Sequence, residues 1–258
     1  DQLGAITTTS VIGITTQNIL SLTTAQFAGF STLTIASLLT TQIAAIESRD
    51  AAAMTTAQVT ALSTAQFSAV VSQMMFGFTT NQIAAIETRD LTQIGSVNIN
   101  FMSSVQIAAL TTNQILVLSS QQLSAINSDD VRAFTTDQLS TLLTTQVLGL
   151  TSQNIDNLDS SQVGAFSTLF ITALTTDQLN AISSQDMRGL TTAQIIALTT
   201  TQVAALDSQS LGGLTTNQWA AIETRDIAAL TSDQFTNGAT TAQLVVLTTD
   251  QIFAMTTL

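Results

Sequence analysis

An eight-residue unit, here called an octad, repeats through nearly the whole chain. Its consensus is Leu-Thr-Thr-x-Gln-Ile-x-Ala, with an apolar residue at positions one and six, Thr or Ser at positions two and three, and Gln at position five. Counted from Ile6, the phase holds without a slip through Asn237, and after one inserted residue, Gly238, it resumes at Ala239. Because a unit this short cannot bury its own apolar face, successive octads have to stack into a solenoid.

The positions of the apolar residues within one octad favour a helix over a strand. A strand would place them at every second position, whereas here they fall at one, six and eight. Thr at position two followed by Gln at position five has the spacing of a helix capping box, and the apolar residues at one and six have the spacing of a hydrophobic staple. Leu190, Thr191, Gln194 and Ile195 give one complete example. We therefore expect a helix to begin in every octad and to run for about one and a half turns.

The predicted fold class is all-α: a solenoid of very short helices, one per octad, which buries positions one, six and eight between units. Helices of this length are unstable alone, so their stability has to come from stacking. The alternative is a β-solenoid rich in Thr.

A second, longer repeat spans 17 octads. Residues 14–37 read ITTQNILSLTTAQFAGFSTLTIAS, and residues 150–173 read LTSQNIDNLDSSQVGAFSTLFITA. The chain thus holds almost two copies of a 136-residue superunit, with no Pro- or Gly-rich linker between them. We expect residues 1–258 to form a single continuous solenoid. Because both ends fall within an octad, we also expect it to be a fragment of a longer array.

Five octads carry Asp in place of Gln at position five, and they contain all five Arg of the chain. Their starting residues are separated by 40, 40, 56 and 40 positions. A superhelix with about five octads per turn would stack such octads on one another and join them by a ladder of Arg–carboxylate pairs. The alternative is an exposed ion pair within each octad, which contributes only about 0–1 kcal/mol. The predicted inter-turn or inter-subunit ion pairs involve Glu47, Arg49, Asp50, Glu87, Arg89, Asp90, Asp130, Arg132, Asp186, Arg188, Glu223, Arg225 and Asp226.

The residue types that are missing argue against an enzyme. The chain has no His, Cys, Tyr, Pro or Lys, so it lacks the usual general bases, thiolates and soft metal ligands. The carboxylate pairs could suggest glycoside hydrolysis, but each has an adjacent Arg that would lower both pKa values, whereas a general acid needs one raised. We predict no catalytic residue and no cofactor. A Ca²⁺ ion bound by Asp129/Asp130 or Asp156/Asp159 is the lesser alternative.

Charge and hydropathy exclude two classes of partner. The net charge is −12, and no basic patch opposes the repulsion of nucleic acid. Ser or Thr interrupts every apolar run before it reaches the length of a membrane span, so no membrane insertion is expected. Trp219 occupies position six and is expected in the core. Met74, Met75 and Phe76 form an apolar octad that would suit a contact between subunits.

The run LTTAQIIALTTTQVAAL, beginning at Leu190, resembles the LTTxQ[IV]xAL arrays of very long bacterial surface or secreted repeat proteins, some described as haem-utilisation or adhesion proteins. The resemblance covers essentially the whole chain and implies an exported, adhesin-like or matrix protein of the bacterial cell surface. Haem binding finds no support, because no His, Cys or Tyr is present as an axial ligand. The expected function is an extracellular structural protein that self-assembles into a filament, sheath or stalk. The alternative is an adhesin that recognises glycans or a surface, with ice binding a lesser one.

Overall fold

The computed structural model describes residues 8–255, and the elements in this range are short helices without a strand. The chain divides into two compact units, Asp1–Ala133 and Phe134–Leu258, each of which is described by itself. The all-α solenoid predicted from the octad is confirmed. A single continuous array across the boundary between the units stays a prediction.

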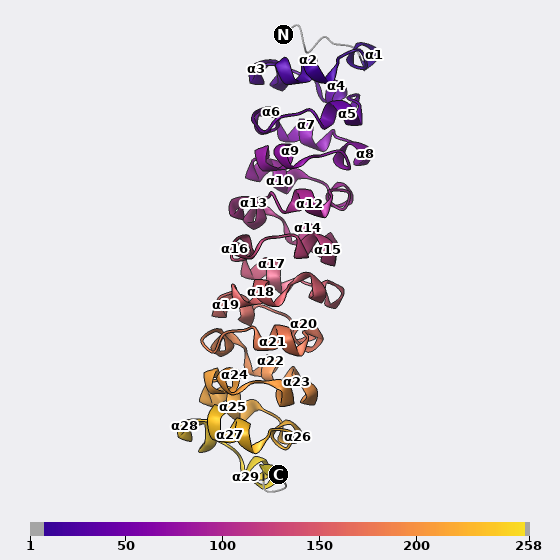
Figure 1. Cartoon of the computed structure of the whole chain (residues 1–258). Coiled ribbons are helices and arrows are strands. Elements are labelled where there is room, and N and C mark those ends of the chain that lie inside the picture. The colour runs from indigo at the N-terminus through magenta and orange to yellow at the C-terminus, as the bar shows by residue number, and fades with distance from the viewer. Residues whose placement is uncertain (1–7, 256–258) are drawn as a thin grey trace. The chain divides into compact units, whose positions relative to one another are not determined.

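The helices of the first unit begin once in every octad (Figure 1). They are α1 (Thr8–Val11), α2 (Thr16–Ser21), α3 (Thr24–Ala28), α4 (Thr32–Ala36), α5 (Thr40–Ile43), α6 (Ser48–Ala53), α7 (Thr56–Thr60), α8 (Thr64–Phe67), α9 (Ser72–Gly77), α10 (Thr80–Ala85), α11 (Thr88–Leu91), α12 (Ser96–Ile99), α13 (Ser104–Ala109), α14 (Thr112–Val117), α15 (Ser120–Ser124) and α16 (Ser128–Val131).

The second unit keeps one element per octad, and two of its octads form 3-10 helices. Its elements are α17 (Thr136–Ser140), η2 (Thr144–Gly149), α18 (Ser152–Asp156), α19 (Ser160–Gly164), α20 (Thr168–Ala173), α21 (Thr176–Asn180), η3 (Asp186–Gly189), α22 (Thr192–Ala197), α23 (Thr200–Ala205), α24 (Ser208–Gly213), α25 (Thr216–Ala221), α26 (Thr224–Ile227), α27 (Ser232–Gly238), α28 (Thr241–Leu244) and α29 (Thr249–Met255). The 3-10 helix η3 begins two residues later in its octad than the other elements, and the start of α28 is shifted by one residue because of the inserted Gly238.

The predicted capping box begins most of these helices. In α22 the Gln194 main-chain N–H donates to Oγ1 of Thr191 at 3.2 Å, and Oε1 of Gln194 accepts from the Thr191 main-chain N–H at 2.6 Å. Both members of the staple, Leu190 and Ile195, are buried. The hydrogen bond from the N-cap N–H to the Gln side chain does not require Thr or Ser at the N-cap. In α5 the N-cap residue is Leu39, and its main-chain N–H still donates to Oε1 of Gln42 at 2.6 Å. Each helix start is therefore specified within its own octad.

Each helix stacks on the helix three octads away in the same unit. In the first unit α3 contacts α6, and α6 contacts α9, so that these helices follow one another along one side (Figure 1). In the second unit α22 contacts α25, and α25 contacts α28. One superhelical turn thus contains three octads. The prediction of five octads per turn is wrong, because the spacing of the Arg-bearing octads is not the spacing at which helices stack.

The buried face of the octad also differs in part from the prediction. Positions one and six are buried as expected, and Trp219 at position six is fully buried, with its indole N–H donating to the Leu211 carbonyl at 3.0 Å. Position eight, however, is only half-buried in repeats such as those ending at Ala45 and Ala85. The third buried position of the octad is instead position five, the Gln; Gln114, for example, is 1% exposed.

The buried Gln side chain bonds the preceding turn of the solenoid. Nε2 of Gln114 donates to the main-chain carbonyls of Ile83 at 2.8 Å and Ile86 at 2.7 Å, which lie 31 and 28 residues back. Gln218 makes the same pair of bonds to Met187 and Leu190, at 2.8 and 2.6 Å. Because a buried amide is costly only when it lacks partners, this Gln can lie in the core.

The one inserted residue is absorbed at the end of a helix. Gly238 closes α27, after which Gln243 and Gln251 reach carbonyls 29 residues back, at Leu214 and Ile222. The stacking of α25 on α28 and of α26 on α29 is kept. In residues 8–255 no helix has both the length and the apolar character needed to cross a membrane.

We predict that Gln114→Glu destabilises the protein by about 3 kcal/mol, because the carboxylate cannot donate to the carbonyls of Ile83 and Ile86 and leaves them buried without partners. Urea denaturation followed by circular dichroism measures the effect. The neighbouring exposed Asn113→Asp makes the same change from amide to acid and serves as the control, with an expected change within about 0.5 kcal/mol. Equal stability of Gln114→Glu and the unchanged protein would contradict the role given to the amide.

Candidate functional site

Three of the five Arg-bearing octads share one arrangement of charges, in which the Glu is the N-cap residue and the Asp occupies position five. In the octad of α6, Nε of Arg49 lies 3.0 Å from Oε2 of Glu47 and 3.6 Å from Oδ2 of Asp50. In the octads of α11 and α26 the Glu contact is made by Nη2 of the Arg and the Asp contact by Nε. The distances are 2.9 and 3.6 Å for Arg89 with Glu87 and Asp90, and 2.5 and 3.5 Å for Arg225 with Glu223 and Asp226.

The other two Arg-bearing octads are built differently. Asp130 accepts from Asn127 in its own octad and from Ser104 one turn back, and Arg132 is the C-cap residue of α16. Asp186 accepts from Oγ of Ser183 at 2.5 Å. Nε of Arg188 donates to the carbonyl of Gly213 at 3.3 Å.

The ion pairs at Arg49, Arg89 and Arg225 therefore join residues of one octad and do not form the predicted ladder between turns. The ladder required octads five units apart to stack, and the solenoid stacks octads three units apart in regular stretches such as α6 on α9. The cross-turn contacts of these octads are hydrogen bonds instead. Nη2 of Arg49 donates to the carbonyls of Leu20 at 3.2 Å and Leu22 at 3.4 Å. A role of these residues between subunits stays a prediction.

The Asp at position five contacts the preceding turn through a hydroxyl. Oγ1 of Thr64 donates to Oδ1 of Asp90, and Oγ1 of Thr200 donates to Oδ1 of Asp226, both at 2.6 Å. Both carboxylates are 0% exposed, and the Oδ2 atom of each is buried without a hydrogen-bond partner. These octads thus exchange the amide–carbonyl bonds of Gln for one hydroxyl–carboxylate bond, and they keep a buried charge beside the Arg.

An Asn at the same position shows what the Asp lacks. Nδ2 of Asn98 donates to the carbonyl of Val70, 28 residues back, at 2.6 Å. Asp has the same shape as Asn, but an ionised Asp has no donor and cannot make this bond. Burial raises the pKa of the Asp50 carboxyl above its ordinary value of 3.8, and the positive charge of Arg49 opposes that rise.

We predict that Asp50→Asn stabilises the protein at pH 7 by about 1 kcal/mol, since it removes a buried charge and supplies a donor. Because the folded state holds the Asp50 proton more tightly than the unfolded state, the free energy of unfolding falls as pH rises from about 3.8 through the raised pKa. Asp50→Asn should lose this part of the pH dependence, measured by urea denaturation from pH 3 to 8. The exposed Asp177→Asn is the control and should keep it. An unchanged pH profile in Asp50→Asn would refute the assignment.

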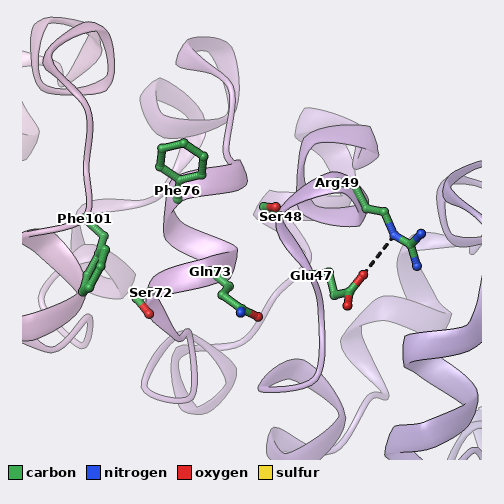
Figure 2. A pocket seen from close by; sticks show the side chains of 7 residues that line it. All are labelled: Glu47, Ser48, Arg49, Ser72, Gln73, Phe76 and Phe101. Carbon is green, nitrogen blue, oxygen red and sulfur yellow. Dashed lines mark ion pairs between the residues drawn. The ribbon is translucent and has the colours of Figure 1, made fainter.

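A groove opens on the first unit next to the first Arg-bearing octad (Figure 2). Its volume is about 410 Å³, and its lining comes from α6 with the preceding Glu47, from α9, and from Phe101, which follows α12. The ring of Phe76, 64% exposed, and the ring of Phe101, 46% exposed, stand at one side, and the Glu47–Arg49 pair stands at the other.

An equivalent groove lies on the second unit, at the same place in the second superunit. Ser48, Ser72 and Gln73 of the first groove correspond to Ser184, Ser208 and Gln209 of the second. The volume of the second groove is about 670 Å³, and the residues equivalent to Phe76 and Phe101 are Gly212 and Asn237. Both grooves are thus features of the superunit, but only the first has aromatic rings.

A glycine at the same superunit position brings the helices together beneath each groove. A Cβ atom on Gly77 would lie 2.2 Å from the Ser48 carbonyl oxygen, and one on Gly213 would lie 2.2 Å from that of Ser184. No side chain fits at such a distance, so these positions require glycine.

The repeat pattern gives no sign of the grooves, although the octad of Phe76 departs from the consensus. Met74 and Met75, predicted with Phe76 to suit a contact between subunits, are fully buried. That part of the prediction is wrong, because both side chains fill the space between turns and only Phe76 reaches the surface.

The acidic residues considered for Ca²⁺ do not gather into a cluster. In the described part of the chain, no group of three or more acidic side chains is placed to hold a metal ion. Asp159 caps α19 and accepts from Oγ of Ser161 at 2.5 Å and from the Gln162 main-chain N–H at 2.9 Å, and these bonds lower its pKa. Asp156 ends α18, and Asp129 lies in the first turn of α16.

Comparison with known families agrees with the repeat seen in the sequence and in the helices. The model of the ALTTAQ repeat matches residues 43–80, 83–120, 179–216 and 219–257, which is more than half of the chain. The chain belongs to the ALTTAQ repeat family. Its four matched ALTTAQ segments form two pairs, and the second pair begins one superunit after the first. No curated protein matches the chain.

Proposed function

We propose that this ALTTAQ repeat protein is an extracellular structural element that self-associates into a filament, sheath or stalk. The observation that carries the proposal is a set of exposed apolar side chains repeated at the superunit spacing. Leu33 and Leu169 occupy equivalent positions in the two superunits, and each is 71% exposed. Ile12 and Leu148 form a second equivalent pair, 60% and 69% exposed. Single exposed apolar residues are common, but the same two positions exposed in both superunits favour a repeated contact.

The rest of the surface supports contact between copies. Only 9% of the residues are charged, so most of the surface can contact another copy without burying a charge, although the net charge of −12 opposes association at low salt. Within each unit, buried Gln side chains bond successive turns, as Gln114 and Gln218 do. No chemistry for catalysis is proposed, since the paired carboxylates lie against Arg within their own octads. The resemblance to secreted bacterial repeat arrays supports a location outside the cell.

We predict that the purified chain forms concentration-dependent polymers, measured by analytical ultracentrifugation and seen by negative-stain electron microscopy. The double substitution Leu33→Ser with Leu169→Ser should shift polymer formation to at least about tenfold higher concentration, because it removes two apolar side chains that would be buried between copies.

Ile196→Ser is the matched control. Ile196 is 47% exposed and has no apolar equivalent in the other superunit, where Thr60 stands in its place. This variant should polymerise as the unchanged chain does. A chain that stays monomeric at all concentrations, or a double variant that polymerises normally, would refute self-association through Leu33 and Leu169.

A further inference from the structure

The aromatic groove of the first unit is open to solvent and has a mixed lining. Phe76 and Phe101 expose ring surface that contributes nothing to the buried core, while Ser48, Ser72 and Gln73 line the same groove with hydroxyl and amide groups. Its volume of about 410 Å³ lies in the range of sites for small ligands. Apolar faces beside a few fixed polar groups are the usual composition of such sites.

We propose that this groove binds a neutral carbohydrate chain. A sugar ring has C–H faces that pack on aromatic rings and a rim of hydroxyls that bond amides, carboxylates and guanidinium groups. In this groove the rings are Phe76 and Phe101, and the polar groups at the opposite side are Glu47 and Arg49 (Figure 2).

The polar side of the groove is held in place before any ligand binds. Nε of Arg49 pairs with Glu47 at 3.0 Å, while its Nη2 donates to the carbonyls of Leu20 and Leu22. Because the guanidinium is fixed by three partners, the Glu47 carboxylate beside it is also restrained, and less side-chain entropy is lost on binding. Glu47 remains 42% exposed, so its carboxylate keeps capacity to accept further hydrogen bonds.

The charges of the groove favour a neutral ligand over other classes. Glu47 and Arg49 compensate each other, and the chain as a whole carries a charge of −12, which repels nucleic acid and sulfated or sialylated glycans. A peptide that binds by adding a strand to a sheet needs a strand edge, and residues 8–255 contain no strand. A neutral saccharide carries no charge that the chain would repel, and it needs no strand edge to bind.

The second groove provides an internal comparison. It keeps Ser184, Ser208 and Gln209 but has Gly212 and Asn237 in place of the two rings, and Ser183 and Gln185 in place of Glu47 and Arg49. Because both the rings and the ion pair are missing from the second groove, we expect the chain to bind one saccharide, in the first unit. This inference does not rest on self-association, which depends on other residues.

The test is isothermal titration of the intact chain with cellohexaose, chitohexaose and maltohexaose, and with a heparin hexasaccharide as the anionic comparison. We expect at least one neutral hexasaccharide to bind with a stoichiometry of one per chain and the heparin fragment not to bind. Phe76→Ala with Phe101→Ala should weaken the binding about tenfold or more, through loss of stacking. Circular dichroism should show that this variant stays folded, since both rings are exposed.

Val97→Ala is the matched control: Val97 is 72% exposed on α12, does not line the groove, and should leave the titration unchanged. The proposal is overturned if no neutral hexasaccharide binds, or if the double Phe variant binds as tightly as the unchanged chain. If no sugar binds, loss of polymer formation by the double Phe variant in ultracentrifugation would show that the groove is a contact between copies instead.

Discussion

The side-chain amide of the repeated Gln makes hydrogen bonds in two directions, and the solenoid depends on both. Its oxygen accepts from the N-cap N–H of its own helix, as Gln114 does from Thr111 at 2.8 Å. Its nitrogen donates to carbonyls of the preceding turn. In octads such as that of Gln114, one side chain therefore both caps its own helix and bonds it to the turn before.

The Arg-bearing octads are exceptions to this rule, and their chemistry follows from the loss of the donor. With Asp at position five, the contact to the preceding turn falls to Thr64 or Thr200, whose hydroxyls bond Asp90 and Asp226. In the octad of Asp50, Arg49 supplies the missing donors to the carbonyl of Leu22 and to that of Leu20. In three of the five octads, those of Asp50, Asp90 and Asp226, the presence of the Arg thus has a local electrostatic reason, namely a carboxylate that the fold buries beside it.

Local features of the fold could be predicted from the sequence, whereas long-range ones could not. The capping box at Thr191 and Gln194 follows from interactions three residues apart, so one octad was enough to predict it. The burial of Gln114 was missed because its carbonyl partners lie 28 and 31 residues away and have no side-chain signature. The number of octads per turn was predicted wrongly for the same reason. The 40-residue spacing of Arg49 and Arg89 suggested five octads per turn, whereas the hydrogen bonds to main-chain carbonyls of the preceding turn, which set the stacking, have no side-chain pattern in the sequence. The groove at Phe76 depends on the close approach at Gly77, which a single octad does not show.

The three-octad turn can be tested by paramagnetic relaxation enhancement from a nitroxide attached at Asn113→Cys. Because the natural sequence has no Cys, this substitution supplies a single labelling site. Asn113 is exposed on α14, which stacks on α11, so that Arg89, three octads back, lies on the adjacent turn. We expect strong broadening of amide resonances around Arg89 and weaker broadening around Gln73, five octads back. The reverse order, with Gln73 most affected, would indicate five octads per turn and would contradict the Gln-bonded solenoid.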